Sequence, residues 1–595
     1  MTVVAALEND LPDPSLFDAW LYAGQDGAWR IRAEASHLAS VPRIDTADLL
    51  QRKARELRRP YLEWAAELAR ANDGVEWWGC ELAARTSYTL FYDRVCALAS
   101  ALETTAARSD RTTLVVCPTP AFAETLGGAP AASASSRSSG VRALRAWVRL
   151  TPSSLLERPG KLSASTRLLL DSDPRYRRRI LERHGAHELR PFAGALLFTW
   201  VDRRSFAADG TYADPHFGPL AEMLRGRGVD VAFVPRVLPG FSFADAVPRL
   251  LATGEAFLFP DAYLELDDHR DCARRAAAFA PAIDDDAAVE EVPLSLLARE
   301  HVELHRPSQA AALALEPLLR RFADAGVKPE RIVHPCEGHG WELVLGWAAR
   351  RHLPRTTVIG YDNLNMSTLA LSMFSAPEEL AIRPQPDRIV TNGPAYRGVL
   401  VREGLPESRV RSGCALRHAY LWNAAPYTPK RGRQLRVLAA TELALGPSVE
   451  LVDKAAAAFA DDDAYDLVVK AHPLQPQAEI VRILGARAAS LRFDERPTLE
   501  LLAEADLLLY TYSAVGFEAL ALGVPPLFVR SETRLDLDQL EYASDLRWEA
   551  RTPTELRAVA AEIATLPLDE WRAKARSAAL AALAPASDSC VDAFL

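Results

Sequence analysis

The sequence is poor in cysteine, and its cysteines are not arranged in the pairs that mark metal or redox motifs. Seven cysteines stand singly among 595 residues, without a Cys-x-x-Cys spacing. Zinc sites and disulfide frameworks are recognised by short, regular cysteine spacings. We therefore expect no disulfide framework and no metal site, and a reducing cytoplasm as the compartment.

Positive charge and long apolar runs are also scarce. The formal net charge of −10 excludes a nucleic-acid partner held by bulk charge, although it leaves room for a local basic pocket. The amino terminus, MTVVAALENDLPDPS, has no basic stretch before an apolar core, so we expect no signal peptide. The apolar stretch 507–529 contains Glu518, two glycines and adjacent prolines, which favours strand, turn and helix over a membrane span. We expect a cytoplasmic protein, with peripheral association at the inner face of the inner membrane left open.

The sequence does contain short apolar segments that alternate with amphipathic helices, which predicts parallel α/β sheets. A first group of strands is expected within 193–201, 229–235, 255–264, 330–342, 356–361 and 387–393. A second group is expected within 435–441, 465–473, 490–495, 506–513 and 524–529. The predicted fold class is α/β: two Rossmann-like domains that face each other, plus a mostly helical amino-terminal extension.

The pattern of strands and helices divides the chain into four predicted parts. Residues 1–189 form the helical and irregular extension, with a flexible loop of small residues at 127–140. Residues 190–425 form the first Rossmann-like domain. Residues 430–570 form the second, and 571–595 form a carboxy-terminal helix and tail.

The stretch VVKAHP, residues 468–473, is a strand that ends on polar groups. Pro473 stops further strand pairing, and a Lys or His in an apolar interior needs a partner. Such strand ends build sites at the carboxyl edge of parallel sheets, whereas the alternative is a strand end that reaches water. Lys470 and His472 would share a strand face, where an ammonium and an imidazole N–H suit a phosphate oxygen.

The stretch YTYSAVGFEALALGVP, residues 510–525, predicts a strand, a hydroxyl-rich turn at Thr511 and Tyr512, and a helix. Ser513 is expected to cap that helix, whose first N–H groups and positive dipole end suit a phosphate. Glu518 is placed to accept a hydrogen bond from a ribose hydroxyl. The alternative is an ordinary capped helix in which Glu518 interacts with the dipole.

A second polar cluster follows the strand that begins at residue 330. The sequence VHPCEGHGWE contributes Glu337, Gly338, His339, Trp341 and Glu342. A general base is a carboxylate or imidazole held near an acceptor hydroxyl, with its pKa tuned by its surroundings. We expect Glu337 to be the catalytic carboxylate. Glu342 is its rival, although it also suits a helix start where it interacts with the dipole.

Three more residues are candidates for the same cleft. Asn363 follows strand 356–361, and Thr441 ends strand 435–441. Arg417 has a planar fork that suits a carboxylate or phosphate, although a surface ion pair is an equal alternative. The Asp triplets at 284–286 and 461–463 are interpreted as solvated charges, so no metal-binding DxD motif is expected.

These motifs together resemble the GT-B glycosyltransferases. The helix sequence SAVGFEALALGVP is similar to the late helix motif of that fold, and Lys-x-His-Pro is similar to the His-Pro motif of bacterial sialyl-, polysialyl- and Kdo-transferases. The segments EGHGWE, IVTNGPAYRGVL and SGCALR also look like a family of predicted surface-carbohydrate biosynthesis proteins. The resemblance covers residues from about 190 to about 570. It implies a GT-B-like pair of Rossmann-like domains with a cleft between them, in which 190–425 binds the acceptor and 430–570 binds a nucleotide-sugar donor. It departs in having one acidic residue before Gly338 and a single serine at Ser513.

The resemblance implies that His472 and Pro473 bind the phosphate region of CMP, that Ser513 assists, and that Glu337 is the catalytic carboxylate. The implied activity transfers a CMP-activated acidic sugar, a nonulosonic acid or Kdo, onto an acceptor oligosaccharide or glycolipid. The implied setting is bacterial capsule or lipopolysaccharide synthesis, without nucleic acid and without a required metal or other cofactor.

Two alternatives stay open at this point. One is a GT-B-like enzyme with another donor: a UDP- or GDP-sugar transferase, an epimerase or a glycerol-phosphate polymerase. The other is a non-catalytic scaffold of a polysaccharide assembly complex.

Overall fold

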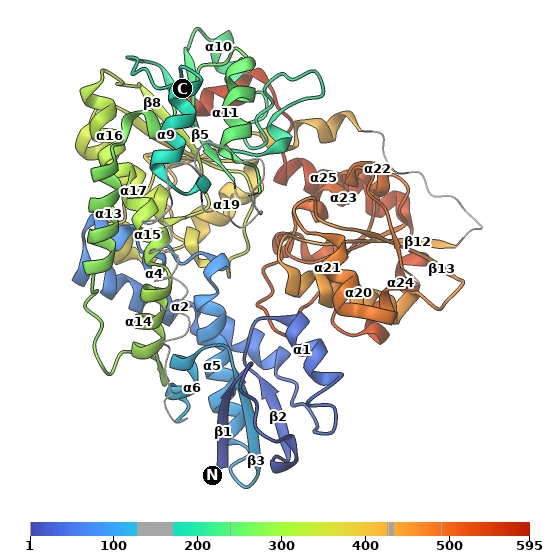
Figure 1. Ribbon diagram of the computed structural model, residues 1–595. Helices are drawn as coiled ribbons and strands as arrows, with labels where there is room; N and C mark the ends of the chain where they lie inside the picture. The colour runs from blue at the N-terminus through green and yellow to red at the C-terminus, as the bar shows by residue number, and fades with distance from the viewer. Residues whose placement is uncertain (1, 128–169, 239, 425–426, 428–433, 490) are drawn as a thin grey trace.

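The computed structural model describes residues 2–127, 170–238, 240–424, 427, 434–489 and 491–595 (Figure 1). All of the predicted flexible loop 127–140 except its first residue lies outside these ranges, as does most of the basic segment 426–434. No helix in the described ranges is long and apolar enough to cross a membrane.

The first large sheet has six parallel strands in the order β11-β10-β9-β8-β4-β5. Its strands are β4 (Ala195–Val201), β5 (Val231–Val237), β8 (Arg331–Pro335), β9 (Thr357–Asp362), β10 (Arg388–Thr391) and β11 (Val410–Ser412). Each is a short apolar run because both faces of a parallel sheet are covered. The strand expected within 255–264 is wrong: Phe257 makes one bridge to Phe233, and a short helix, α12 (Pro260–Tyr263), follows.

Alternate residues of β4 face two different cores. Leu196 and Phe198 pack with the helices on one face, whereas Ala195 and Leu197 pack with α10 and the carboxy-terminal segment on the other. The surrounding helices are α9 (Pro174–Arg183), α10 (Leu220–Gly226), α11 (Phe243–Ala252), α13 (Leu266–Ala278), α14 (Ser295–Leu304), α15 (Arg306–Leu313), α16 (Leu315–Asp324), α17 (Gly340–His352), α18 (Pro377–Leu380) and α19 (Pro394–Arg402). A two-stranded hairpin pairs β6 (Ala288–Val289) with β7 (Val292–Pro293).

The second large sheet repeats the plan with the order β14-β13-β12-β15-β16-β17. Its strands are β12 (Leu435–Ala440), β13 (Tyr465–Lys470), β14 (Arg492–Phe493), β15 (Leu507–Tyr510), β16 (Pro526–Val529) and β17 (Trp548–Ala550). Its helices are α20 (Leu445–Phe459), α21 (Gln477–Leu484), α22 (Thr498–Leu502), α23 (Val515–Leu522), α24 (Pro553–Ala564) and α25 (Leu568–Ala582). The predicted fold class, a GT-B-like pair of Rossmann-like units, is confirmed. The residue ranges proposed for the four domains stay a prediction.

Both sheets reverse their strand order at one point, and these two points locate the site. In the first sheet the chain starts at β4, adds β5 on one side and later adds β8 on the other. In the second sheet it starts at β12, adds β13 on one side and later adds β15 on the other. Ligands of open parallel sheets bind at the carboxyl ends of the strands that flank such a reversal.

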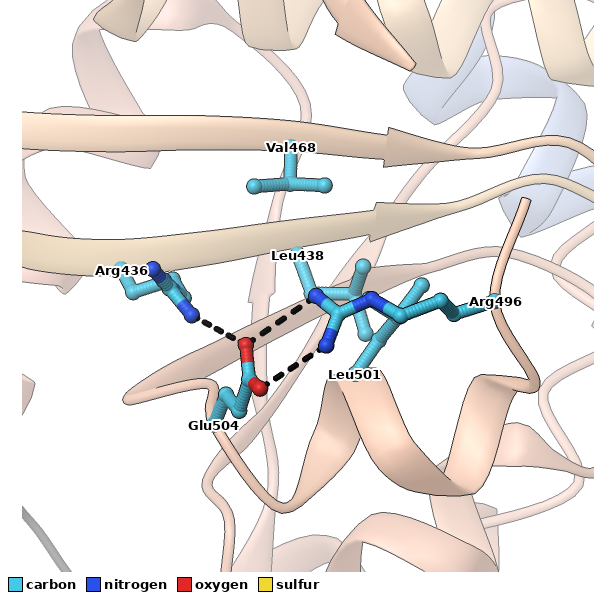
Figure 2. A pocket seen from close by; sticks show the side chains of 6 residues that line it. All are labelled: Arg436, Leu438, Val468, Arg496, Leu501 and Glu504. Carbon is cyan, nitrogen blue, oxygen red and sulfur yellow. Dashed lines mark hydrogen bonds and ion pairs between the residues drawn. The ribbon is translucent and has the colours of Figure 1, made fainter. Parts of the chain in front are cut away.

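A small cavity inside the second unit lies away from that edge. It has a volume of about 10 Å³ and is lined by Leu438 and Val468 from the middle of β12 and β13, with Leu501 beside them (Figure 2). Glu504 closes it by bonding Arg436 and Arg496. The cavity has room for one water molecule at most, so it is not the substrate site.

The amino-terminal region is mostly helical, as predicted, but it also contains a small parallel sheet that the sequence only partly indicated. Its order is β1-β3-β2, and only β3 is indicated by the sequence, through the apolar run within 111–119. The strands are β1 (Thr2–Leu7), β2 (Ala19–Tyr22) and β3 (Thr112–Cys117); the helices are α1 (Gly27–Glu34), α2 (Ala47–Asn72), α3 (Val75–Trp78), α4 (Glu81–Ala84), α5 (Phe91–Ala106) and α6 (Pro120–Thr125).

This region contacts both Rossmann-like units, and in Figure 1 it lies beneath them, with α1 under the second unit. Arg85 pairs with Glu379 of the first unit at 2.8 Å, and both side chains are fully buried. Arg30 pairs with Glu450 of the second unit at 3.1 Å. A buried charge that loses its partner is costly, so these pairs make the region an integral part of the molecule.

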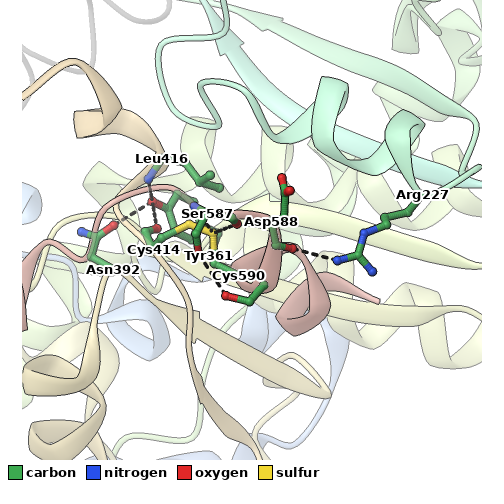
Figure 3. The surroundings of a disulfide bond; sticks show 9 residues. Arg227, Tyr361, Asn392, Cys414, Leu416, Ser587, Asp588 and Cys590 are labelled. Carbon is green, nitrogen blue, oxygen red and sulfur yellow. Dashed lines mark hydrogen bonds between the residues drawn. A yellow bond between two sulfur atoms is a disulfide. The ribbon is translucent and has the colours of Figure 1, made fainter. Parts of the chain in front are cut away.

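The expectation of no disulfide is wrong for one pair of cysteines. Cys414 and Cys590 are bonded, with a sequence separation of 176 and a Cα–Cα distance of 5.8 Å (Figure 3). No short cysteine spacing in the sequence indicates this pair, because the chain runs through the whole second unit before its end returns to the first sheet. There Cys590 and Phe594 pack into the core beside Tyr361. The other five cysteines are free and buried.

Candidate functional site

The carboxyl end of β8 carries a tight loop that presents Glu337. Gly338 has φ of +78°, and a Cβ atom there would lie 2.5 Å from the carbonyl oxygen of Ser372, so the loop requires glycine. The carboxylate of Glu342, in the first turn of α17, accepts the N–H groups of Glu337 at 3.1 Å and of Gly338 at 2.9 Å. Glu342 therefore holds the shape of the loop.

The surroundings of this loop shift the pKa values of its two carboxylates in opposite directions. Burial acts to raise the pKa of Glu337, but the hydrogen bond from His339 at 3.2 Å, with the charges of His339 and Arg417, outweighs burial and lowers it. Burial raises the pKa of Glu342 to about 7, and the neighbouring Glu337 adds to the shift. Paired carboxylates with opposite shifts are typical of acid–base sites.

Tyr88, from the amino-terminal region, stands over this loop. Its ring stacks on His339 with centroids 5.7 Å apart and an interplanar angle of 13°. The ring is 62% exposed, and the Glu337 carboxylate is the largest cause of the raised pKa of Tyr88. The segment that carries it is held at both ends by left-handed residues, Arg85 and Leu90. Sequence reasoning missed Tyr88, because nothing in residues 1–189 shows where that segment packs.

Further polar groups are buried around Glu337. The charge of Glu337 acts on His216. The Nδ1 atom of His216 lies 3.4 Å from the side-chain amide nitrogen of Asn363, which follows β9. Burial raises the pKa of the adjacent Asp362 to about 8. One oxygen of Asp362 accepts the N–H groups of Leu364 and Asn365, while the other lacks a partner in the described part of the chain. His216 was not predicted, because it stands in a segment without a strand-end motif.

At the second sheet, His472 follows β13 and is oriented by its own backbone. The N–H of His472 donates to Thr441 Oγ1 at 2.9 Å, and the N–H of Leu474 donates to His472 Nδ1 at 3.2 Å. Nδ1 is thus an acceptor, which places the proton of the neutral ring on Nε2. Burial, with the charges of Arg204 and Arg417, lowers the pKa of His472 to about 4. At neutral pH the ring is an uncharged hydrogen-bond donor.

The remaining predicted donor residues fall into two groups. Lys470 Nζ donates to the carbonyl of Glu495 at 2.8 Å, so the structure directs Lys470 toward β14, apart from His472. Thr511 is buried and Tyr512 is half-buried next to the start of α23, and their hydroxyls have no hydrogen-bond partner among the described residues. The strand expected over 465–473 is shorter in the structure: β13 ends at Lys470, three residues before Pro473.

Ser513 lies one position earlier than a conventional cap of α23. The N-cap residue is Ala514, and Ser513 Oγ accepts the N–H of Val515 at 3.3 Å. Glu518, one turn further, accepts a hydrogen bond from the hydroxyl of Tyr420 at 2.8 Å. Glu518 thus connects the second unit to the segment that links the two units.

The charge of Arg417 acts on residues at the carboxyl edges of both sheets. It lies in a 3-10 segment, Leu416–Asn423, directly after the disulfide-bonded Cys414. Its charge acts on Glu337 in the first unit and on His472 and Glu518 in the second. No hydrogen bond or ion pair to another described residue occupies its guanidinium. Leu416 N–H donates to the Tyr361 hydroxyl at 2.8 Å, which fixes the start of the segment.

Glu442 is a second residue that sequence reasoning missed. It follows Thr441 at the end of β12, where burial raises the pKa of Glu442 to about 7. One of its oxygens has no partner in the described chain, and its charge acts on Tyr88. Its position after a buried strand was the available signal. No group of three or more metal-ligating side chains occurs in the residues that the structure covers.

The arrangement can bind an oxyanion and remove a proton nearby. His472 Nε2–H and the guanidinium groups of Arg417 and Arg204 provide donors and positive charge. Arg204 itself pairs with Asp202 at 2.6 Å. Glu337, ionised and hydrogen-bonded to His339, provides a proton acceptor on the opposite edge.

Comparisons with known proteins give distant likenesses only. No family model and no curated protein sequence matches the chain. The S. aureus MnaA-UDP structure aligns with a TM-score of 0.41 and 12% identity, covering 67% of this chain and 94% of that one. The glycosyltransferase of kitacinnamycin aligns with a TM-score of 0.41 and 16% identity, over 68% and 99% of the two chains. MurG of Acinetobacter baumannii aligns with a TM-score of 0.36 and 14% identity, covering 67% of this chain and 98% of that one. At these values the likeness bears on neither substrate nor activity.

Proposed function

We propose that the protein is a glycosyltransferase that moves a CMP-activated acidic sugar onto an acceptor glycan. The observation that carries the proposal is the position of Arg417, whose charge reaches Glu337 on one sheet edge and His472 on the other. A donor phosphate held between His472 and Arg417 would place its sugar carbon toward Glu337. The sequence resemblance of the Lys-x-His-Pro motif supports the same assignment.

Each residue has a defined part in the proposed reaction. His472 Nε2–H, Arg417 and the N–H groups at the start of α23 stabilise the negative charge that develops on the departing CMP phosphate. Glu337 takes the proton from the attacking acceptor hydroxyl, and His339 holds its carboxylate in place. The leaving group is a phosphate monoester whose charge Arg417 and the neutral Nε2–H donor of His472 can stabilise, so the proposed step needs no divalent cation.

The acidic character of the donor is supported by the number of cations at the junction. Arg204 and Arg417 both act on His472, although they come from separate segments of the chain. One guanidinium suits the phosphate, and a second suits a carboxylate on the sugar. The neutral hexose of a UDP- or GDP-sugar supplies no carboxylate for either guanidinium; Arg204 is already paired with Asp202, whereas Arg417 has no ion-pair partner among the described residues. We therefore rank a nonulosonic acid or Kdo above those donors.

The proposed acceptor is an oligosaccharide or glycolipid of a bacterial surface polysaccharide. The exposed face of Tyr88 is placed to stack against an acceptor sugar beside Glu337. A non-catalytic scaffold is disfavoured because the Glu337 carboxylate, unlike that of Glu342, bonds no described backbone group and has its pKa lowered by His339.

The test is titration calorimetry of the full chain with CMP, CDP, UDP and GDP. CMP is expected to bind wild type, and His472→Ala is expected to weaken it by about tenfold or more, because a charge-assisted hydrogen bond is lost. The exposed His187 provides the matched control variant, His187→Ala, which is expected to bind CMP as wild type does. Tight binding of UDP or GDP in place of CMP would overturn the donor assignment. Binding of no nucleotide at all would favour the scaffold.

A further inference from the structure

Beyond the junction, the edge of the first sheet carries a second cationic feature. Arg236 lies near the carboxyl end of β5, directly beside Trp200 in the neighbouring β4. Its guanidinium carbon is 4.6 Å from the ring centroid of Trp200 and 4.3 Å from that of Trp341 at the start of α17. The two indoles meet edge-on, with an interplanar angle of 86°, so they form a corner around the cation.

This guanidinium has no acceptor among the described residues. No hydrogen bond or ion pair involves it there, and its charge interacts at longer range with Glu342 and with Arg177. Burial lowers the pKa of Arg236 to about 10, which leaves the side chain charged at neutral pH. A half-buried charge without an acceptor is costly, and a second guanidinium nearby adds to that cost. The cost is recovered if a ligand supplies an anion.

Two further polar atoms beside the corner also lack partners in the described chain. Trp341 is only 6% exposed, and its Nε1–H has no acceptor. His334 is fully buried and has its ring 5.7 Å from that of Trp341. Its Nδ1 donates to the carbonyl of Pro335 at 2.7 Å, which leaves Nε2 as an acceptor without a donor. A hydroxyl group, directly or through a water molecule, accepts from the indole and donates to the imidazole.

We propose that Arg236, Trp200 and Trp341 form a subsite for an oxyanion, a carboxylate or a phosphate, carried by the acceptor glycan. The proposal rests on the glycosyltransferase function above and names its acceptor class as acidic. Glu342 connects the two places, because it supports the Glu337 loop and follows Trp341 in sequence. An acceptor with its oxyanion on Arg236 would extend along the sheet edge from β5 toward β8 and present a hydroxyl to Glu337.

The contribution of Arg236 is directional as well as electrostatic. The two indole faces cover the guanidinium from two sides, so its N–H groups are available to a ligand along the remaining edge. Carboxylates and phosphates match that edge by accepting two parallel hydrogen bonds. A neutral sugar lacks this pairing, so the subsite selects acidic acceptors over neutral ones of the same size.

The test uses the full chain and three hexose probes of similar size: glucuronic acid, glucose 6-phosphate and glucose. Saturation-transfer NMR and calorimetry are expected to show that an acidic probe binds and that glucose binds at least about tenfold more weakly. Arg236→Gln is expected to remove this preference, whereas Arg236→Lys keeps the charge and retains part of it. Arg249 lies over Phe206 at 4.2 Å and is solvent-exposed, so Arg249→Gln is the matched control and is expected to bind as wild type.

The outcomes separate this proposal from the proposed function. Binding of glucuronic acid alone identifies an acidic sugar as the source of the oxyanion, and binding of glucose 6-phosphate alone identifies a phosphoryl group. Equal binding of acidic probes to wild type and to folded Arg236→Gln overturns the subsite, as does equal binding of all three probes or of none. CMP titration of the same variants reports on the junction alone: Arg236→Gln is expected to bind CMP as wild type does.

Discussion

The carboxyl edges of the two sheets have the same topology but carry different chemistry. The first edge buries ionisable groups that interact with each other: the pKa of Glu337 is lowered, and the pKa of Glu342 is raised to about 7. At the second edge His472 and Thr441 are bonded mainly to backbone and to each other, and His472 is a neutral donor. Coupled ionisable groups suit proton transfer, whereas oriented neutral donors beside arginines suit the binding of an oxyanion.

The difference teaches how a two-sheet enzyme can divide its tasks. The first edge adjusts protonation through mutual contact of charged side chains. The second edge positions donors with backbone geometry and receives its positive charge from Arg204 and Arg417, neither of which lies in its own sheet. The site is therefore complete only when the two units are docked, and the amino-terminal region, paired to both units, holds them in that position.

The largest effect is expected from removing the proton acceptor of the first edge. Glu337→Gln keeps the shape of the side chain but removes its charge, so kcat is expected to fall by about 10²–10⁴-fold. The affinity for CMP, measured by calorimetry, should stay unchanged because it depends on the second edge. The exposed Glu330 gives the control Glu330→Gln, expected to be fully active. Full activity of Glu337→Gln would remove the proton-transfer role from the first edge.

A smaller effect on both edges is expected from Arg417→Gln. Because Arg417 acts on Glu337 and on His472, its loss should weaken CMP binding and lower kcat together, each by about 10–100-fold. The two quantities are measured by calorimetry and steady-state kinetics. The matched control is Arg411→Gln, at an exposed position six residues away. A change in only one quantity would assign Arg417 to a single edge.

Tyr88 tests whether the amino-terminal region belongs to the first edge. Tyr88→Ala removes the ring stacked on His339 and is expected to raise the KM for the acceptor by about three- to tenfold, leaving the KM for the donor unchanged. Tyr88→Phe keeps the ring and is the control, with the acceptor KM close to that of wild type. Equal kinetics of the alanine variant and wild type would limit Tyr88 to a surface role.

The last prediction concerns the pH dependence of the free energy of unfolding at the first edge. The pKa of Asp362 is raised to about 8, so the folded state keeps a proton that the unfolded chain loses near its ordinary pKa of 3.8. Its contribution is present below pH 4 and is lost as pH rises toward 8. Asp362→Asn should therefore gain on the order of 1 kcal/mol per pH unit relative to wild type between pH 5 and pH 8.

The measurement is thermal unfolding of both proteins at several pH values. The exposed Asp284 provides the control Asp284→Asn, for which no pH-dependent difference is expected. A constant difference between Asp362→Asn and wild type across this range would mean that the first edge does not hold a protonated carboxyl.

Much of the molecule could be predicted from the sequence because its signals are local. Continuous apolar runs between helices predicted both large parallel sheets, and Gly338 and Pro473 marked the places where strands turn into loops. The apolar periodicity of 308–326 is that of one long helix, but the structure divides this segment into α15 and α16 at Ala314, since periodicity alone does not show a bend. The catalytic and donor-binding roles assigned to residues such as Glu337 and His472 stay predictions until the experiments above are made.

The sequence by itself determined the fold class and the loops that carry Glu337, His472 and Ser513, because burial patterns and turn residues act over a few positions. Only the tertiary structure decided the partners of those loops. It placed Tyr88 on His339, Arg417 between the two edges, and Cys414 against Cys590. Those contacts join segments far apart in the chain, and no local pattern encodes which distant surfaces meet when the apolar faces are buried.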